Sequence, residues 1–164
     1  NPRAHSISMR PQGDGLRVTV CRGATLEFVK LTLDKFRPSL LSKQAVLRAR
    51  PQLSREEVEK MREEAKALLP RRVAELAHLY GFSYTKVTIR DSKTRWGSCS
   101  GRNSLSLSLY LMQVPEHLQD YVILHELCHT VHHDHSPQFW ALMDSVTEGK
   151  AHALRRELRR YYTN

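Results

Sequence analysis

His125, Glu126 and His129 stand at a spacing that suits metal-dependent hydrolysis, in the sequence His125-Glu126-Leu127-Cys128-His129. On an α-helix, residues four apart share one face and lie about 6 Å apart along the axis. Two imidazoles can therefore close on one metal ion, and the carboxylate after the first histidine can take a proton from water. The pattern predicts a Zn²⁺ site with His125 and His129 as ligands and Glu126 as general base.

A chance occurrence of this HExxH pattern is the alternative, because the chain contains nine histidines. The neighbouring residues argue against chance, since Leu124, Leu127 and Cys128 make the segment apolar. Two imidazoles on such a helix would cost free energy unless a metal or hydrogen bonds satisfied them. The surroundings therefore favour the metal site.

A third protein ligand is expected, because catalytic zinc usually has three and keeps one position open. Ser136-Pro137 predicts the start of a new helix, so the chain must turn before it. Such a turn directs His135 back toward the metal, and His135 is the preferred third ligand. Glu148 and His132 are the main alternatives.

Arg95 lies in a loop predicted from Thr94 to Gly101. Its guanidinium would stabilise a developing oxyanion or make a structural ion pair, and the ion pair is preferred. Cys99 and Cys128 are interpreted as buried structural thiols rather than nucleophiles. With Cys21 they make three widely spaced cysteines, which predict no disulfide framework and favour a reducing, cytoplasmic setting.

The N-terminal part of the chain predicts short strands followed by a helix. Alternating residues from 7 to 20 indicate strands around a Gly13-Asp14-Gly15 turn. A helix is expected from Thr25 to Leu33, with Pro38 close behind it. Arg50 to Leu53 is interpreted as a connector.

A long helical segment is expected from residue 55 to residue 80. Ser54 and Glu57 have the spacing of a capping box at its start, and Gly81 suits its end. Pro70 lies inside, so the segment is expected to be two helices or one kinked helix.

The C-terminal half predicts the elements around the HExxH sequence. Strands are expected at 84–90 and 104–111, and in the second the leucines alternate with serines, so one face should meet a core. That second strand is interpreted either as an ordinary sheet strand or as an edge strand that pairs with a peptide substrate. Helices are expected at 117–132, from Pro137, and at 150–161. The elements together predict an α+β fold with N-terminal β-strands, a small antiparallel or mixed sheet and an HExxH helix.

The chain is basic, with a formal net charge of +9. This charge is compatible with DNA or acidic partners, and equally with an ordinary solvated surface. The rival function is therefore a nucleic-acid-associated protein with a structural zinc, or a DNA-linked protease that combines both. No apolar run approaches the roughly 20 residues of a membrane span, so no membrane association is expected.

Three ordered motifs resemble the YgjP-like metallopeptidases: Arg95-Trp96-Gly97-Ser98-Cys99, the HELCH sequence at residues 125–129, and His135-Ser136 with Phe139-Trp140. Together they cover roughly residues 90 to 140. The resemblance implies a zincin fold of the gluzincin type, zinc bound by His125, His129 and His135, Glu126 as general base, and a protein or peptide substrate. It also implies a relationship to SprT-like and WLM-type peptidases, some of which act on proteins crosslinked to DNA.

The chain departs from this family between Thr130 and Asp134, where relatives tend to have Leu directly after HExxH and Asn before the third histidine. The departure concerns the turn and leaves the three histidines in place. A length of 164 residues fits one metallopeptidase domain over 1–164. Within it, we expect a strand and helix subregion at 1–50 and the helical and zincin core at 51–164.

Overall fold

The computed structural model describes residues 7–12, 15–21, 23–48 and 53–161. They form the predicted α+β fold. The elements are β1 (Ser8–Gln12), β2 (Gly15–Thr19), α1 (Leu26–Arg48), α2 (Arg55–Tyr80), β3 (Lys86–Arg90), β4 (Gly97–Cys99), β5 (Ser104–Ser108), the 3₁₀ helix η1 (Leu109–Gln113), α3 (Glu116–Cys128), α4 (Pro137–Val146) and α5 (Ala151–Leu158). These residues divide into two compact units, one ending at Arg48 and the other beginning at Leu53. The prediction of one domain over 1–164 stays a prediction.

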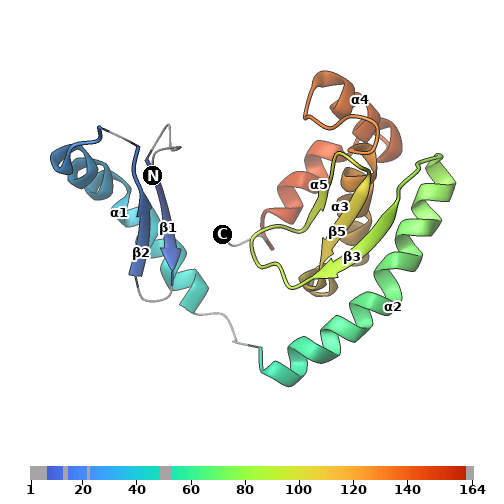
Figure 1. Ribbon diagram of the computed structural model, residues 1–164, viewed down its shortest axis with the longest axis horizontal. Coiled ribbons are helices and arrows are strands. Elements are labelled where there is room, and N and C mark those ends of the chain that lie inside the picture. Colours follow the sequence, from blue (N-terminus) through green and yellow to red (C-terminus); the bar gives the residue numbers. More distant parts are fainter. Residues whose placement is uncertain (1–6, 13–14, 22, 49–52, 162–164) are drawn as a thin grey trace. The chain divides into compact units, whose positions relative to one another are not determined.

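The first unit consists of the β1–β2 hairpin and helix α1 (Figure 1). The two strands are antiparallel, with Met9 opposite Val18, and α1 packs on β1. Helix α1 is longer than the predicted 25–33, because it continues through Pro38 to Arg48. A proline removes one backbone hydrogen bond but does not by itself end a helix. The predicted Gly13-Asp14-Gly15 turn and Arg50–Leu53 connector fall largely outside the described residues.

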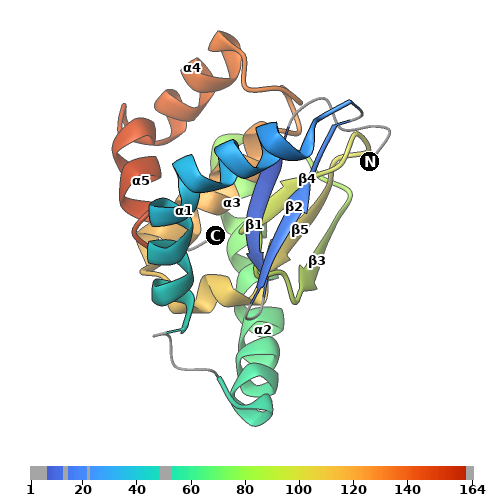
Figure 2. The ribbon, with the colours of Figure 1, turned by 90° about the vertical axis from the view of Figure 1, so that its left-hand side faces the viewer.

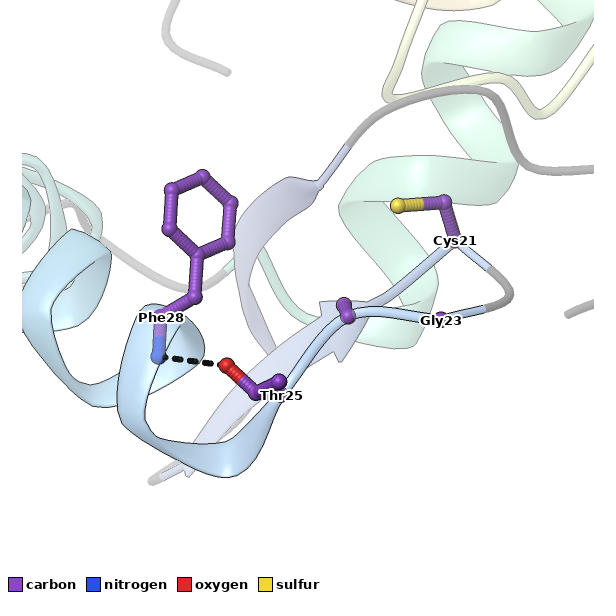
Figure 3. Close-up of a pocket in the computed structure, with 5 residues that line it drawn as sticks. Cys21, Gly23, Thr25 and Phe28 are labelled. Carbon is purple, nitrogen blue, oxygen red and sulfur yellow. Dashed lines mark hydrogen bonds between the residues drawn. The ribbon is translucent and has the colours of Figure 1, made fainter.

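A pocket lies where the chain enters α1, as Figure 3 shows. Its lining residues are Cys21, Gly23, Ala24, Thr25 and Phe28. The Thr25 hydroxyl accepts a hydrogen bond from the Phe28 backbone N–H at 3.3 Å, which caps the first turn of the helix. The pocket belongs to the first unit, and no residue of the HExxH sequence lines it.

Helix α2 begins and ends where its capping residues predict. The Glu57 carboxylate accepts from the Ser54 N–H at 2.7 Å, and the Ser54 hydroxyl accepts from the Glu57 N–H at 3.1 Å. Gly81 ends the helix in the left-handed conformation, with φ of 73°. Pro70 does not divide α2 into two helices, because Leu69 and Val73 on either side of it are buried in one core.

The second unit contains a mixed sheet of strand order β3–β5–β4. Figure 1 shows β3 beside β5. Strand β5 runs parallel to β3 and antiparallel to β4. Of the two interpretations of residues 104–111, the ordinary sheet strand is confirmed, and the loop expected at 94–101 is wrong in part. Residues 104–111 do not form an edge strand, since β5 has a neighbour on both sides and ends at Ser108, where the chain turns into η1. The segment 94–101 is not entirely loop, since it contains the edge strand β4.

The core of the second unit lies between this sheet and its helices. Helices α2 and α3 contact each other and the sheet, and α4 and α5 pack against α3 (Figure 2). Leu105 and Leu107 of β5 are buried, as their alternation predicts. Arg72 fastens α2 to α3 through two hydrogen bonds to the Asp120 carboxylate, at 2.7 and 2.6 Å. The sheet and α2 therefore hold α3 from several sides.

The chain direction changes sharply after α3. The helix ends at Cys128, earlier than the predicted His132, and His129 is its C-cap. Helix α4 then begins as predicted, with Ser136 as N-cap and Pro137 in its first turn. Helix α5 is shorter than the predicted 150–161. None of the helices within the described residues is long and apolar enough to cross a membrane.

Candidate metal centre

Three histidines come together at the end of α3. His125 and His129 lie on the helix, and His135 comes from the turn before α4. One ligand nitrogen from each lies within 4.8 Å of the other two. The Nε2 atoms of His125 and His135 are 3.1 Å apart. The turn between α3 and α4 thus brings the three imidazoles close enough to share one metal ion.

The ring of His129 is held in one orientation by the turn that follows it. Its Nδ1 lies 2.8 Å from the backbone carbonyl oxygen of His132. A carbonyl only accepts, so Nδ1 carries the proton and donates, and Nε2 is left with its lone pair. An N–H of this kind fixed by a carbonyl is typical of metal-binding histidines. His132 therefore contributes its backbone and not its side chain.

Phe139 of α4 contacts all three imidazoles. Its ring centroid lies 4.9 Å from His125, 4.4 Å from His129 and 4.9 Å from His135. The Phe139 side chain is fully buried. It forms an apolar wall against which the rings are packed, and this restricts their rotation. Trp140 lies beside it, 6.0 Å from the His135 ring.

The environment keeps His125 neutral. Burial lowers its pKa to about 3, and the charges of His129, His135 and Arg155 lower it in the same direction. Burial also lowers the pKa of His129. A neutral imidazole has a lone pair to give to a metal, whereas a protonated one does not. The cluster is thus electronically suited to a cation.

Glu126 is buried on the same helix, with only 5% of its surface exposed. Burial raises its pKa to about 8, and the positive charge of Arg95 acts in the opposite direction. A carboxyl group with a pKa near neutrality is suited to exchanging a proton under physiological conditions. Arg95 itself is exposed and makes no ion pair with any described residue, so the preferred structural ion pair is not found.

Strand β4 lies directly against the Glu126 side chain. A Cβ atom at Gly97 would approach Glu126 Cγ to 2.6 Å and Oε1 to 2.7 Å. Cys99, two residues on and on the same face, has its thiol pKa raised first by burial and then by the charge of Glu126. Gly97 was not among the candidate site residues that the sequence predicted. The signal that could have identified it is its place as the glycine of the RWGSC motif.

The other sequence candidates lie outside the cluster. Glu148 is exposed, and its carboxylate contacts the Lys150 ammonium at 2.7 Å. The Glu148 backbone is in the left-handed conformation, with φ of 53°. Cys128 is fully buried, as predicted, while Cys99 is half-buried, and both are free thiols. Neither sulfur belongs to the group of candidate ligands.

The family model described as "YgjP-like, metallopeptidase domain" matches residues 51–161. This range contains the histidine cluster and the whole of the second unit's core. Together with the three imidazoles, this match suggests a metal ion at the cluster, without identifying the metal. It gives no support to the predicted association with DNA.

Two crystal structures of archaeal metallopeptidase zymogens share the fold. Abylysin of Pyrococcus abyssi is 20% identical with a TM-score of 0.51, and the match covers 57% of this chain and 94% of abylysin. Jannalysin of Methanocaldococcus jannaschii is 20% identical with a TM-score of 0.50, covering 57% of this chain and 95% of jannalysin. No curated protein matches the chain.

Proposed function

Because the chain belongs to the YgjP-like metallopeptidase family, we propose that it hydrolyses peptide bonds with Zn²⁺ held by His125, His129 and His135 and with Glu126 as general base. The convergence of the three imidazoles beside a buried carboxylate is the observation that carries this proposal. Catalytic zinc usually has three protein ligands and one open position, and three histidines are one of the known ligand sets.

The donor set fits zinc. All three candidate ligands are imidazoles, which suit Zn²⁺, whereas Mg²⁺ and Ca²⁺ prefer oxygen. The His129 Nδ1–H donates a hydrogen bond to the His132 carbonyl, which leaves the Nε2 lone pair for the metal. His135 is exposed, so the centre is open to solvent on that side. When bound, zinc would lower the pKa of water and polarise the scissile carbonyl.

Glu126 carries the proton. It takes one from the attacking water and gives it to the nitrogen of the leaving amine. Burial favours the protonated form of the carboxyl group, which helps Glu126 to hold the proton between the two transfers. Arg95, whose charge lowers that pKa, helps to keep the carboxylate ionised before attack. Arg95 thus acts on the base, in addition to any contact with the oxyanion.

The outer edge of β4 is where we place the peptide substrate. The Ser108 N–H donates to the Trp96 carbonyl, and the Ser100 N–H donates to the Ser104 carbonyl. Antiparallel pairing alternates, so the backbone groups of the intervening Gly97 and Cys99 point away from β5. Among the described strands, β4 has no neighbour on that side. An extended peptide can add there as a further strand, next to Glu126.

Replacing Glu126 by Gln tests the proposal. Gln keeps the size of the side chain but cannot accept the proton, so the variant should retain zinc and lose kcat by about 100-fold or more. Zinc is measured by elemental analysis, and cleavage with a fluorogenic peptide library. Unchanged cleavage with zinc retained would contradict the role of Glu126 as general base. A purified chain without zinc would contradict the proposal that the three histidines bind zinc.

A further inference from the structure

Gly97 of β4 lies close to the Glu126 side chain. A Cβ atom there would lie 2.6 Å from Cγ, 2.7 Å from Oε1 and 2.9 Å from Cδ of Glu126. Non-bonded carbon atoms rest about 3.5–4.0 Å apart. The present position of the Glu126 side chain is therefore available only when residue 97 has no side chain.

The backbone at Gly97 does not itself require glycine. Its φ is not in the left-handed region, unlike that of Gly81 or Gly149. Gly101, which follows β4 on the same segment, has no atom within 4 Å of a Cβ built on it. The requirement at position 97 is thus one of space, and the atoms that occupy the space belong to Glu126.

Both partners belong to elements that are anchored in the second unit. Strand β4 is paired with β5, and Gly97 lies opposite Leu107, which is 1% exposed. Glu126 stands on α3 next to Leu127, which is fully buried. Because Cγ is only two bonds from the helix backbone, a Cβ at position 97 would force rotation about χ1 of Glu126. That rotation would move the carboxylate to a different place.

We propose that Gly97 is a positioning residue, whose bare backbone holds the Glu126 carboxylate in its working rotamer. The inference rests on the proposed function, because the working rotamer is defined by the general-base role of Glu126. In this role the absence of a side chain at Gly97 acts through Glu126, and Gly97 touches neither metal nor reacting atoms. Its outward-pointing backbone groups, where the peptide substrate is placed, are the same in an alanine variant. A residue with any side chain at this position would leave the metal site complete and the base misplaced.

The kinetic test compares Gly97→Ala with Gly101→Ala in the full-length chain. The probe is the fluorogenic peptide that the unsubstituted chain cleaves fastest. Gly97→Ala should lower kcat by about 100-fold or more, as expected for a misplaced general base, with KM and zinc content unchanged. Gly101→Ala should leave all three unchanged. A Gly97→Ala chain with full kcat, or one that loses zinc while it remains folded, would overturn the proposal.

A double-mutant cycle asks whether Gly97 acts through Glu126. In a Glu126→Gln background the base is already lost, so Gly97→Ala should cost no further activity. Losses that multiply would show that Gly97 contributes by another route, and would overturn the positioning role.

A third comparison uses thermal unfolding and needs no activity. Glu126→Ala removes the atoms that a Cβ at position 97 would meet, so Gly97→Ala should lower Tm in the natural background and leave it unchanged in the Glu126→Ala background. If the Gly97→Ala variant alone fails to fold, the comparison of Glu126→Ala with the double variant still tests the proposal. Equal Tm losses in both backgrounds would contradict the role of Gly97, whereas full activity of Glu126→Gln would contradict the proposed function.

Discussion

At the scale of single residues, Glu126 couples the stability of the metal-free chain to pH. Burial raises its pKa from 4.5 to about 8, so the folded state holds the proton more tightly than the unfolded state. The stabilisation from this proton is complete below pH 4.5 and disappears as pH rises through about 8. Burial thus makes an ionised Glu126 unfavourable for the folded, metal-free chain.

We predict that the Glu126→Gln variant, without metal, is more stable than the natural chain at pH 8, by on the order of a few kcal/mol. The two should differ least below pH 4.5, the ordinary pKa of a glutamate side chain, and increasingly above it. Urea unfolding of chelator-treated protein at a series of pH values measures the difference. A difference that does not grow with pH would show that Glu126 is not desolvated.

His135 is the ligand that the HExxH sequence does not contain, and its removal tests the third position. We predict that His135→Ala weakens zinc binding 10-fold or more, by at least about 1.4 kcal/mol, without unfolding the chain, because His135 is exposed. Competition with a chromogenic chelator measures the affinity. His133→Ala, in the same turn and also exposed, is the matched control. If Glu148→Ala had the larger effect, Glu148 would be the third ligand.

At the scale of elements, the start of α4 holds His135 in place. His135 directly precedes Ser136, whose hydroxyl accepts from the Phe139 N–H. We predict that Ser136→Ala costs about 1 kcal/mol of stability and also weakens zinc binding. Ser54→Ala removes the equivalent cap of α2 and should cost a similar amount while leaving zinc affinity unchanged. Equal zinc affinity in the two variants would mean that the cap does not position the ligand.

The elements that local chemistry defines were predictable from the sequence. The Ser54–Glu57 capping box, the Gly81 C-cap and the Ser136-Pro137 start need only neighbouring residues, and each is found where expected. The effect of Pro70 was not predictable, because the burial of residues on both sides of it overrides the local cost.

Strand β4 shows the limit of local reasoning. Gly97 to Cys99 form a strand because β5 pairs with them, and pairing partners cannot be read from three residues with little strand propensity. The choice between an edge strand and an ordinary sheet strand for β5 was left open for the same reason. In the site, the helical spacing predicts that His125 and His129 share a face, but the contact between Gly97 and Glu126 joins two distant elements.

At the scale of the whole molecule, the metal centre and the buried core belong to one unit. All residues of the hydrophobic core cluster lie between Leu53 and Leu158. The matching family model covers residues 51–161, and the two archaeal structures match only 57% of this chain. The second unit therefore contains what is needed to bury apolar surface and to assemble the three histidines.

We predict that a chain beginning at Leu53 folds and binds one equivalent of zinc. Circular dichroism and elemental analysis measure this, with the full-length chain as reference. Peptide cleavage by the two chains then shows whether the first unit contributes to activity. A shortened chain that is unfolded in the presence of zinc would show that the first unit is needed for folding.

The uneven burial of α2 has a consequence for the exchange of its backbone amides with deuterium. Fully buried side chains begin only at Ala65 and continue to Ala77, while the helix itself begins at Arg55. Amides before Ala65 need only local opening to exchange, whereas those between Ala65 and Ala77 require disruption of the core. Mass spectrometry should find rapid labelling at 55–64 and protection at 65–77, so that a single helix reports both local fraying and global unfolding. Uniform protection along α2 would mean that the whole helix opens as one unit with the core.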